Sequence, residues 1–201
     1  MKNYKNSNIN KFCDFYSEKA KKEGYPARSV YKLMEIQNKF KLFQQGFHVL
    51  DIGCAPGSWL MYASSIVGNE GKVFGIDVQP ITIRHPSNTQ LYQGDIYELS
   101  QILFDTYQNS FDVVMSDMAP STSGVRHLDA ARSFSLCEIA FDVASQCLKK
   151  SGSFVCKIFQ GSEFKSFSEK IKEQYRQVKI FKPKSSRKQS VEIYLIGIDK
   201  K

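Results

Sequence analysis

The chain has no long hydrophobic run and few of the residues from which metal sites and disulfide frameworks are built. None of its apolar runs approaches the roughly 18 residues of a membrane helix, and its basic start lacks the apolar stretch of a secretory signal. Its three histidines are scattered, and its five cysteines include no Cys-x-x-Cys pair. We therefore expect no membrane association, no metal site, and cysteines that serve as small buried residues in a reducing compartment.

The intracellular compartment stays open between cytoplasm, nucleus and an organelle such as the mitochondrion, because a basic start is compatible with organelle import. A length of 201 residues with 42% hydrophobic content suits one domain with a full core. We expect residues 1–10, which are rich in Asn and Lys, to be flexible, and residues 11–201 to form that single domain as a monomer.

Positive charge is concentrated at the two ends of the chain. Residues 1–41 hold ten Lys and Arg against four Asp and Glu, and residues 150–201 hold thirteen against five. The middle, residues 42–149, is acidic, with five against eleven. Any single basic run could be a solvated surface, but two basic ends around an acidic centre are typical of a polyanion footprint beside another kind of site.

Short apolar strands alternate with helical stretches from Phe47 onward. This alternation predicts an α/β fold with a mostly parallel sheet, helices on both faces, and ligands at the carboxyl ends of the strands. The predicted strands are 47–52, 73–77, 89–93, 112–117, 153–159, 177–182 and 191–198. The predicted helices are 11–24, 29–40, 57–67, 97–107, 129–149 and 162–175. No helix joins the last two strands, which favours an antiparallel hairpin.

The first predicted strand ends in a glycine loop of the kind that binds nucleoside cofactors. Asp51 precedes the loop Gly53-Cys54-Ala55-Pro56-Gly57, and an apolar helix containing Trp59 follows. Glycines allow a sharp turn and a close approach to a ligand, and the helix N–H groups favour an anionic group. Asp77 ends the second strand, where it can accept hydrogen bonds from ribose hydroxyls. Asp95 follows the third strand, within reach of an adenine amino group.

The glycine spacing favours S-adenosylmethionine as the cofactor. A dinucleotide such as NAD normally requires Gly-x-Gly-x-x-Gly, and this loop has no third glycine. A ligand with a carboxylate and a sulfonium but no phosphate suits the loop better. The alternatives are a binding site for NAD and a glycine turn that binds no ligand. Asp51 is suited either to the cationic amino-acid end of the cofactor or to bracing the loop.

Four ionisable residues occupy positions where a plain core strand or helix would not need one. Asp117 and Lys157 end two separate apolar strands, Glu192 interrupts the last strand, and Lys32 lies on an early helix. A charge at the end of a buried strand is costly unless it is paired or used. Three of them also have a plainer alternative: a strand-end cation paired to a neighbour for Lys157, a solvent-facing strand residue for Glu192, and an exposed helix lysine for Lys32.

Taken together, the motifs resemble those of the FtsJ-like ribosomal RNA large-subunit 2′-O-methyltransferases, over about residues 12–198. They are Ala27-Arg28-Ser29-Val30-Tyr31-Lys32-Leu33, Asp51-Ile52-Gly53-Cys54-Ala55-Pro56-Gly57-Ser58-Trp59, Ser116-Asp117-Met118-Ala119-Pro120, Lys157-Ile158-Phe159-Gln160-Gly161, and Lys182-Pro183 leading to Ser185-Ser186-Arg187 and Glu192-Ile193-Tyr194. The resemblance implies a Rossmann-like methyltransferase fold with seven strands, the last one antiparallel. It also implies a catalytic tetrad of Lys32, Asp117, Lys157 and Glu192.

The residues expected at the S-adenosylmethionine site are Gly53, Cys54, Ala55, Pro56, Gly57, Trp59, Asp77, Asp95, Ile96 and Asp117. For Trp59, packing in the core is the stronger alternative to stacking on a base. Basic residues that flank the tetrad are expected to contact RNA phosphates and to position the RNA without reading its sequence: Arg28, Lys182, Lys184, Arg187 and Lys188.

The tetrad residues suit the chemistry of a ribose 2′-hydroxyl, which must lose its proton as it attacks an electrophilic methyl carbon. Lys157 is the expected base when its amine is neutral, and Asp117 is expected to orient it. Lys32 and Glu192 are expected to position the hydroxyl and the lysine. The four groups titrate as one coupled unit, and no metal is required.

The sequence therefore predicts an S-adenosylmethionine-dependent methyltransferase that modifies a uridine ribose in large-subunit ribosomal RNA or a pre-ribosomal particle. An oxygen acceptor is preferred because residues 117–120 lack the Asn/Asp-Pro-Pro-aromatic turn of many amino-nitrogen methyltransferases. The hydroxyl itself favours RNA over DNA. The alternatives are a 2′-O-methyltransferase of the tRNA anticodon loop or the mRNA cap, a non-catalytic RNA-binding ribosome assembly factor, and a small-molecule O-methyltransferase.

Overall fold

A computed structural model describes residues 7–82, 84–187 and 189–201, with the backbone alone for residues 7–14. The segment 1–10, which we expected to be flexible, lies largely outside the described residues, and its last four residues begin a helix. Lys188, one of the predicted RNA contacts, also lies outside them. None of the helices in the described part of the chain is long and apolar enough to cross a membrane.

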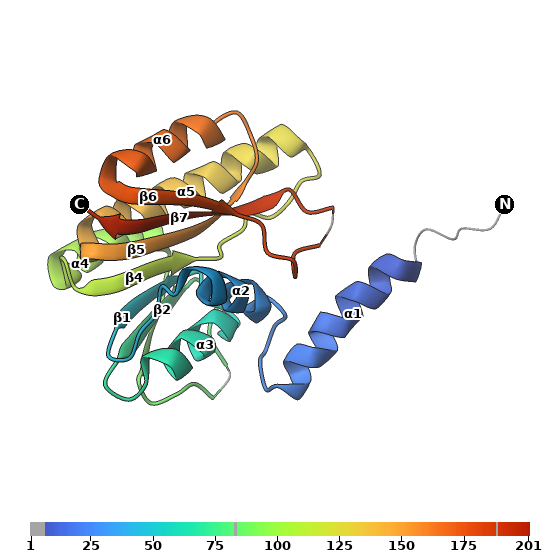
Figure 1. Cartoon of the computed structure of the whole chain (residues 1–201), viewed down its shortest axis with the longest axis horizontal. Coiled ribbons are helices and arrows are strands. Elements are labelled where there is room, and N and C mark those ends of the chain that lie inside the picture. Colours follow the sequence, from blue (N-terminus) through green and yellow to red (C-terminus); the bar gives the residue numbers. More distant parts are fainter. Residues whose placement is uncertain (1–6, 83, 188) are drawn as a thin grey trace.

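One seven-stranded sheet forms the centre of the protein, in the order β3-β2-β1-β4-β5-β7-β6 (Figure 1). The strands are β1 His48–Ile52, β2 Lys72–Asp77, β3 Thr89–Gln93, β4 Phe111–Ser116, β5 Leu148–Phe159, β6 Tyr175–Phe181 and β7 Glu192–Lys200. Strands β1 to β5 pair in parallel, whereas β7 is antiparallel to both of its neighbours, β5 and β6. The predicted mostly parallel sheet and terminal hairpin are therefore confirmed.

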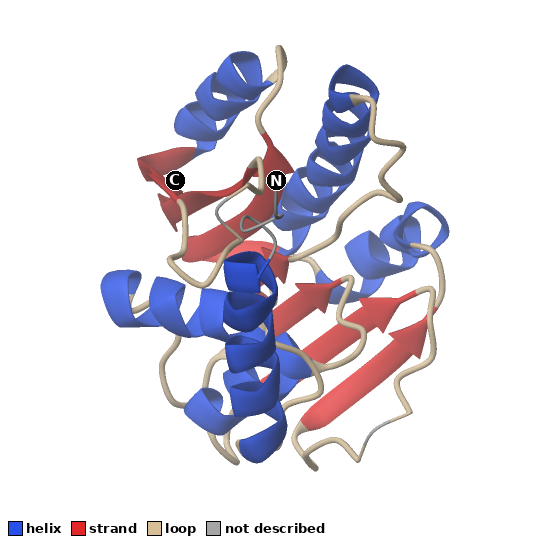
Figure 2. Cartoon of the chain, turned by 90° about the vertical axis from the view of Figure 1, so that its right-hand side faces the viewer, coloured by secondary structure: helices blue, strands red, loops and turns tan. Residues whose placement is uncertain are grey.

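Helices cover both faces of this sheet (Figure 2). They are α1 Ser7–Lys22, α2 Val30–Phe40, α3 Ser58–Val67, α4 Ile96–Tyr107, α5 Arg126–Cys147 and α6 Phe164–Gln174. Helices α2 and α3 contribute to the core on one face, and α4, α5 and α6 contribute to the core on the other. Helix α1 projects away from the sheet (Figure 1) and packs through Ala20 against Val30 and Tyr31.

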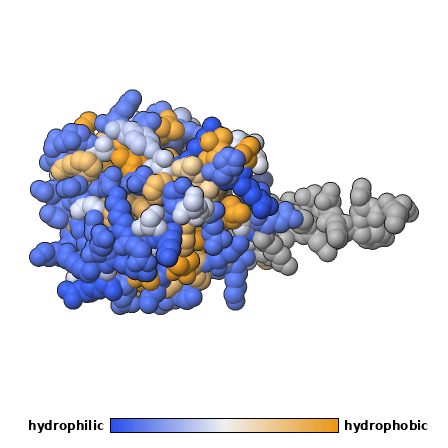
Figure 3. All heavy atoms as spheres, turned by 90° about the horizontal axis from the view of Figure 1, so that it is seen from above, coloured by the Kyte–Doolittle hydropathy of each residue, from blue (hydrophilic) through white to orange (hydrophobic). Residues whose placement is uncertain are grey.

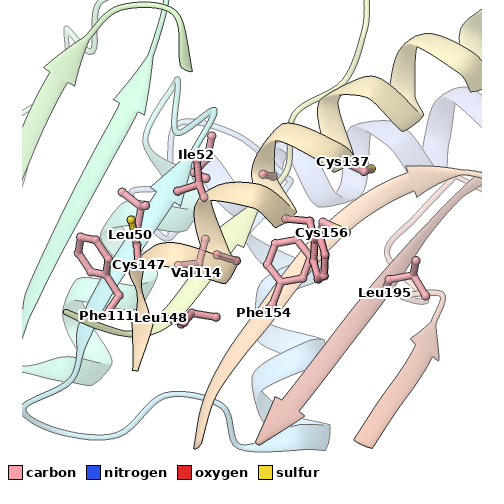
Figure 4. Close-up of a cluster of buried hydrophobic side chains, with 14 of the residues drawn as sticks. Leu50, Ile52, Phe111, Val114, Cys137, Cys147, Leu148, Phe154, Cys156 and Leu195 are labelled. Carbon is pink, nitrogen blue, oxygen red and sulfur yellow. The ribbon is translucent and has the colours of Figure 1, made fainter. Parts of the chain in front are cut away.

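The two cores exist because side chains alternate between the faces of each strand. In β1, Leu50 and Ile52 join the core under α4 to α6 (Figure 4), whereas Val49 joins the core under α2 and α3. With both faces buried, the central strands are mostly apolar, as expected for a parallel sheet. Cys54, Cys137, Cys147 and Cys156 are free and buried in these cores, as predicted for the cysteines whose side chains are described.

The main difference from the predicted boundaries is at the start of β5. The sequence pattern predicted a helix over 129–149 and a strand over 153–159, whereas α5 ends at Cys147 and β5 begins at once with Leu148. Ser151 has a positive φ of 62°, and the pairing with β4 shifts register between Phe111 and Val113. This irregular stretch belongs to β5 because it pairs with β4, and no local sequence pattern indicated that pairing. The face of the molecule in Figure 3 is mostly hydrophilic, with smaller apolar areas between the polar side chains.

Removing a large side chain from the core should destabilise the protein far more than removing one from the exposed sheet edge. Phe154 of β5 is fully buried, whereas Ile180 of β6 is 57% exposed. We expect Phe154→Ala to lower the free energy of unfolding by about 3–5 kcal/mol, and Ile180→Ala by no more than about 0.5 kcal/mol. Urea denaturation followed by circular dichroism measures both. Equal losses would contradict the described core.

Candidate active site

The four predicted tetrad residues meet at one edge of the sheet as two ion pairs. Lys157 Nζ lies 3.0 Å from Asp117 Oδ1, and Lys32 Nζ lies 2.9 Å from Glu192 Oε1. Asp117 follows β4, and Lys157 lies near the end of the parallel strand β5. Because β7 is antiparallel, its first residue, Glu192, pairs with Phe159 beside those strand ends. The sheet topology therefore brings together residues separated by up to 160 positions in the chain.

Both ion pairs are largely shielded from solvent. The side chains of Lys157 and Asp117 are 6% and 16% exposed, and those of Lys32 and Glu192 are 14% and 13% exposed. Lys157 Nζ also donates a hydrogen bond of 2.5 Å to the backbone oxygen of Asp117. Lys32 is therefore not an exposed helix lysine, and Glu192 is not a solvent-facing strand residue. Their catalytic roles stay predictions.

Tyr194 connects the two ion pairs, and the sequence reasoning did not assign it to the site. Its side chain is fully buried, and its hydroxyl donates to Asp117 Oδ1 at 2.6 Å. Lys32 Nζ lies 5.9 Å from the centre of its ring, within the range of a cation–π contact. Tyr194 lies two residues after Glu192 on the same strand. Side chains at that spacing share a face, so the spacing was a signal for the contact.

The charges around Asp117 favour its ionised form. Burial alone raises the pKa of this carboxyl, but the ammonium groups of Lys157 and Lys32 and the hydrogen bonds from Tyr194 and Lys157 outweigh it, so the pKa lies below its usual range. Burial, followed by the charges of Asp117 and Glu192, raises the pKa of Tyr194 well above its ordinary value. Tyr194 is therefore a neutral donor to a negatively charged Asp117.

A cavity of about 350 Å³ opens beside Asp117 at the carboxyl ends of β1, β2, β3 and β4. Its lining includes six of the predicted cofactor residues: Gly53, Ala55, Asp77, Asp95, Ile96 and Asp117. Three aspartates thus face the cavity, and among its described lining residues there is no Lys or Arg. The negative charge of this lining would repel a pyrophosphate. It favours a cationic ligand with hydroxyl groups, such as a nucleoside that carries a sulfonium.

The loops around this cavity are held in place by the carboxylates that line it. Asp77 accepts hydrogen bonds of 2.8 Å from the backbone N–H groups of Ala55 and Gln79. Asp95 caps α4 by accepting a hydrogen bond from the backbone of Tyr97 at 3.0 Å. Gly53 has a φ of +77°, and a Cβ there would collide with the side chain of Met118. Only glycine therefore suits this turn.

The other four predicted cofactor residues, Cys54, Pro56, Gly57 and Trp59, are not among the residues that line the cavity. Trp59 is 3% exposed, and its indole N–H donates to the backbone oxygen of Ser29 at 2.9 Å. It lies in the core between α2 and the sheet, as the packing alternative for this residue supposed. Gly57 is buried at the start of α3, and Pro56 is exposed. Cofactor contact by these four residues stays a prediction.

Asp51 is a fully buried carboxylate without a hydrogen-bond partner for either oxygen among the described residues. Burial, followed by the charges of Asp117 and Asp77, raises the pKa of its carboxyl well above the usual range. The backbone N–H of Leu60 acts in the opposite direction, but it does not complete a well-formed hydrogen bond. An unpaired carboxylate in this position is costly until a cation or donor approaches it.

The predicted RNA contacts whose positions are described lie near the Lys32–Glu192 pair. Arg28 donates to the backbone oxygen of Ser185 at 2.7 Å, which links it to the loop between β6 and β7. Lys182, Lys184 and Arg187 belong to that loop and are exposed. Lys182 Nζ also donates to the backbone oxygen of Ser190 at 2.7 Å, which closes the base of the loop.

The strand order, the glycine loop and the acidic cavity at the carboxyl edge define a methyltransferase of the doubly wound α/β class. A sequence model of the FtsJ-like methyltransferase family matches residues 25–200. The chain therefore belongs to the FtsJ-like methyltransferase family, and the resemblance of its motifs and its predicted fold class are both confirmed.

Relatives agree with this placement. The chain is 51% identical to the ribosomal RNA large subunit methyltransferase E of Desulforapulum autotrophicum, over 96% of this chain and 95% of that protein. It is 52% identical to the methyltransferase E of Desulfatibacillum aliphaticivorans, over 96% and 93%. A crystal structure assigned provisionally as a ribosomal RNA methyltransferase from Plasmodium falciparum superposes with a TM-score of 0.74 at 28% identity, covering 88% of this chain and 98% of that one.

The buried charge of Asp51 predicts a pH-dependent effect of Asp51→Asn on stability. Because the folded-state pKa of Asp51 is raised, its favourable contribution is complete below the unfolded value, about 4, and is lost as pH rises through the folded value. Without cofactor, the Tm of Asp51→Asn relative to the original protein should therefore increase from pH 4 to pH 8. Each 1 kcal/mol should correspond to roughly 2–4 °C.

Differential scanning fluorimetry across this pH range measures the difference. The control is Asp142→Asn, because Asp142 lies on the surface of α5, is 57% exposed, and is 3.7 Å from Lys170. Its Tm difference should stay nearly constant with pH. A difference for Asp51→Asn that does not change with pH would contradict the assigned environment of Asp51.

Proposed function

We propose that the chain transfers a methyl group from S-adenosylmethionine to a ribose 2′-hydroxyl of large-subunit ribosomal RNA, on a uridine. The observation that carries this proposal is the Lys157–Asp117 pair at 3.0 Å, formed at the rim of an acidic cavity and flanked by the second pair, Lys32–Glu192. A lysine that can give up its own proton is suited to receive one from a hydroxyl. The names of the two bacterial relatives support ribosomal RNA as the substrate.

The residues of the cavity suit the proposed cofactor. Gly53 and Ala55 would approach its amino-acid end, Asp77 its ribose and Asp95 its base, and the acidic lining would favour its positive charge. When bound, the cofactor supplies an electrophilic methyl group on a sulfonium. The carboxyl group of Asp51 has no hydrogen-bond partner among the described residues and lies beneath the same loop. A nearby positive charge on the cofactor would stabilise its ionised form.

In the proposed reaction, the neutral amine of Lys157 would receive the proton of the 2′-hydroxyl at Nζ while the oxygen bonds to the methyl carbon; the methyl–sulfur bond would break, and the cofactor would leave as a neutral thioether. Asp117 holds Nζ in place, and the Tyr194 hydroxyl donates to the same carboxylate oxygen, Oδ1, at 2.6 Å and so helps to fix the carboxylate. Lys32 and Glu192, joined at 2.9 Å, lie beside this pair and would orient the ribose. Much of the rate would come from holding the hydroxyl in line with the methyl group.

Among the alternatives, a tRNA anticodon-loop or mRNA-cap enzyme would use the same four residues, and only the RNA would differ. The ordered tetrad disfavours a non-catalytic assembly factor, and a basic loop beside the tetrad disfavours a small-molecule acceptor.

We further propose that the protein acts as a monomer. The bacterial origin of the relatives favours the cytoplasm over a nucleus or an organelle. Ribose-methylation mapping of total RNA, with and without the gene, distinguishes the RNA substrates.

The proposed base gives a direct prediction for Lys157→Ala. We expect methyl transfer to fall by roughly a hundredfold or more, while cofactor affinity changes little, because Lys157 does not line the cavity. Labelled-methyl transfer to ribosomal RNA and cofactor titration calorimetry measure the two quantities. Lys149→Ala is the matched control. Lys149 lies on the same strand and pairs with Asp112 at 2.8 Å, at the opposite end of the sheet.

Lys149→Ala should retain nearly full methyl transfer. If Lys157→Ala methylated RNA at close to the original rate, Lys157 would not be the base, and the proposed mechanism would fail. If both variants lost activity together, the loss would point to weakened β4–β5 pairing instead.

The basic loop gives a second prediction, for the double variant Lys184→Glu with Arg187→Glu. RNA affinity should fall, and the slope of log affinity against log salt should decrease by about one for each phosphate that is no longer neutralised. Fluorescence anisotropy with an RNA fragment over a salt series measures both. The control is the double variant Lys150→Glu with Lys172→Glu, which makes the same charge reversal elsewhere. Both lysines are exposed; Lys150 lies near the start of β5 and Lys172 near the end of α6. An identical salt response in the two double variants would contradict the proposed footprint.

A further inference from the structure

The loop between β6 and β7 is described over residues 182–187 and 189–191, and its residues 183–186 pack against the protein. Pro183, Ser185 and Ser186 are buried, with Ser185 1% and Ser186 4% exposed. Lys184 and Arg187, which flank the two serines, are exposed. The backbone around Ser185 and Ser186 is thus held in place, while the neighbouring Lys184 and Arg187 are exposed. A fixed backbone requires contacts that hold it.

Those contacts come from Glu35 on α2 and from Arg28 just before this helix. The two carboxylate oxygens of Glu35 accept hydrogen bonds from successive backbone N–H groups, those of Lys184 at 2.6 Å and Ser185 at 2.8 Å. Arg28 donates to the backbone oxygen of Ser185 at 2.7 Å. Hydrogen bonds to a charged acceptor are short and strong, and two of them fix the orientation of the peptide as well as its distance.

The same helix also holds the residue at which the loop ends. Lys32 lies three residues before Glu35 on α2, on the same side of the helix, and it pairs with Glu192 at 2.9 Å. Helix α2 therefore holds the chain at two points, the backbone at 184–185 and the side chain at Glu192. The distance between the exposed basic side chains of the loop and the tetrad depends on these two contacts.

We propose that Glu35 is a positioning residue for RNA. It fixes the β6–β7 loop so that Lys184 and Arg187 bind the RNA backbone at a set distance from the tetrad. This role rests on the proposed function. Glu35 would act through the loop and would not touch the ribose or the cofactor, because it lines no part of the cavity.

The sign of the effect separates this role from a simple charge effect. Removing a negative charge beside a basic loop should strengthen RNA binding if only the charge mattered. Loss of positioning should weaken RNA binding instead. Glu35→Gln removes the charge, and its amide has one acceptor oxygen for two N–H groups. Glu35→Asp keeps the charge, but its side chain is one methylene shorter and cannot reach both N–H groups in the same way.

The experiment compares Glu35→Gln, Glu35→Asp and the control Glu18→Gln, which makes the same charge change on the exposed surface of α1. For both Glu35 variants we expect the KM for RNA to rise roughly tenfold, with kcat and the cofactor Kd within about twofold of the original values. Glu18→Gln should bind RNA as well as the original protein or slightly better. Methyl-transfer kinetics, RNA anisotropy and thermal unfolding are measured on the same preparations.

A double-mutant cycle tests whether Glu35 acts through the loop. On a background of Lys184→Ala with Arg187→Ala, the additional effect of Glu35→Gln on RNA affinity should nearly vanish, because the groups that it positions are gone. A full, additive effect on that background would overturn the proposal, as would RNA binding by Glu35→Gln that equals or exceeds that of the original protein. Absence of methyl transfer by the original protein, with RNA binding intact, would overturn the proposed function alone.

Discussion

A lysine amine at the end of a buried strand is stable only beside an opposite charge, and in this protein that charge is Asp117. Lys157 Nζ and Asp117 Oδ1 lie 3.0 Å apart, and neither side chain is much exposed. Asp117 directly follows β4, and Lys157 lies near the end of β5. Losing either partner would leave the other as an uncompensated buried charge. The strands β4 and β5 must therefore stay in register, and the groups around this pair must satisfy its remaining hydrogen bonds.

The antiparallel strand β7 supplies those groups. Because it enters the sheet from the edge where the parallel strands end, it brings Glu192 and Tyr194 to the buried pair. Tyr194 donates to Asp117 Oδ1, the oxygen that also faces Lys157 Nζ, and Glu192 neutralises Lys32. The tetrad is thus two neutral pairs connected through one aromatic ring. The ammonium of Lys32 also stabilises the charge of Asp117, so Asp117 would keep a nearby positive charge while the amine of Lys157 is neutral.

Helix α2 connects this chemistry to the surface. One of its turns carries Lys32, which faces the tetrad, and Glu35, which holds the backbone of the basic loop. The cavity on the other side of Asp117 is acidic, whereas the loop beyond Glu192 is basic. A cationic ligand and a polyanion are therefore favoured on opposite sides of one buried ion pair.

The sequence alone determined the layout of the strands and helices, because apolar periodicity and glycine positions are local signals. Most predicted bounds agree with the structure to within about three residues, within the usual error of such predictions. The sequence also predicted Asp77 and Asp95 for one site, and both line the same cavity, since each lies at the end of a strand of the sheet or just after it. Lys32 and Glu192 depended on the family resemblance, because nothing in their own neighbourhoods indicates a partner 160 residues away.

Only the tertiary structure decided the pairing of the four charges, the part played by Tyr194, the burial of Trp59 and the contact of Glu35 with the basic loop. The physical reason is the same in each case. A hydrogen bond or an ion pair between distant segments depends on strand order and on the distance between side chains, and neither is written in local composition.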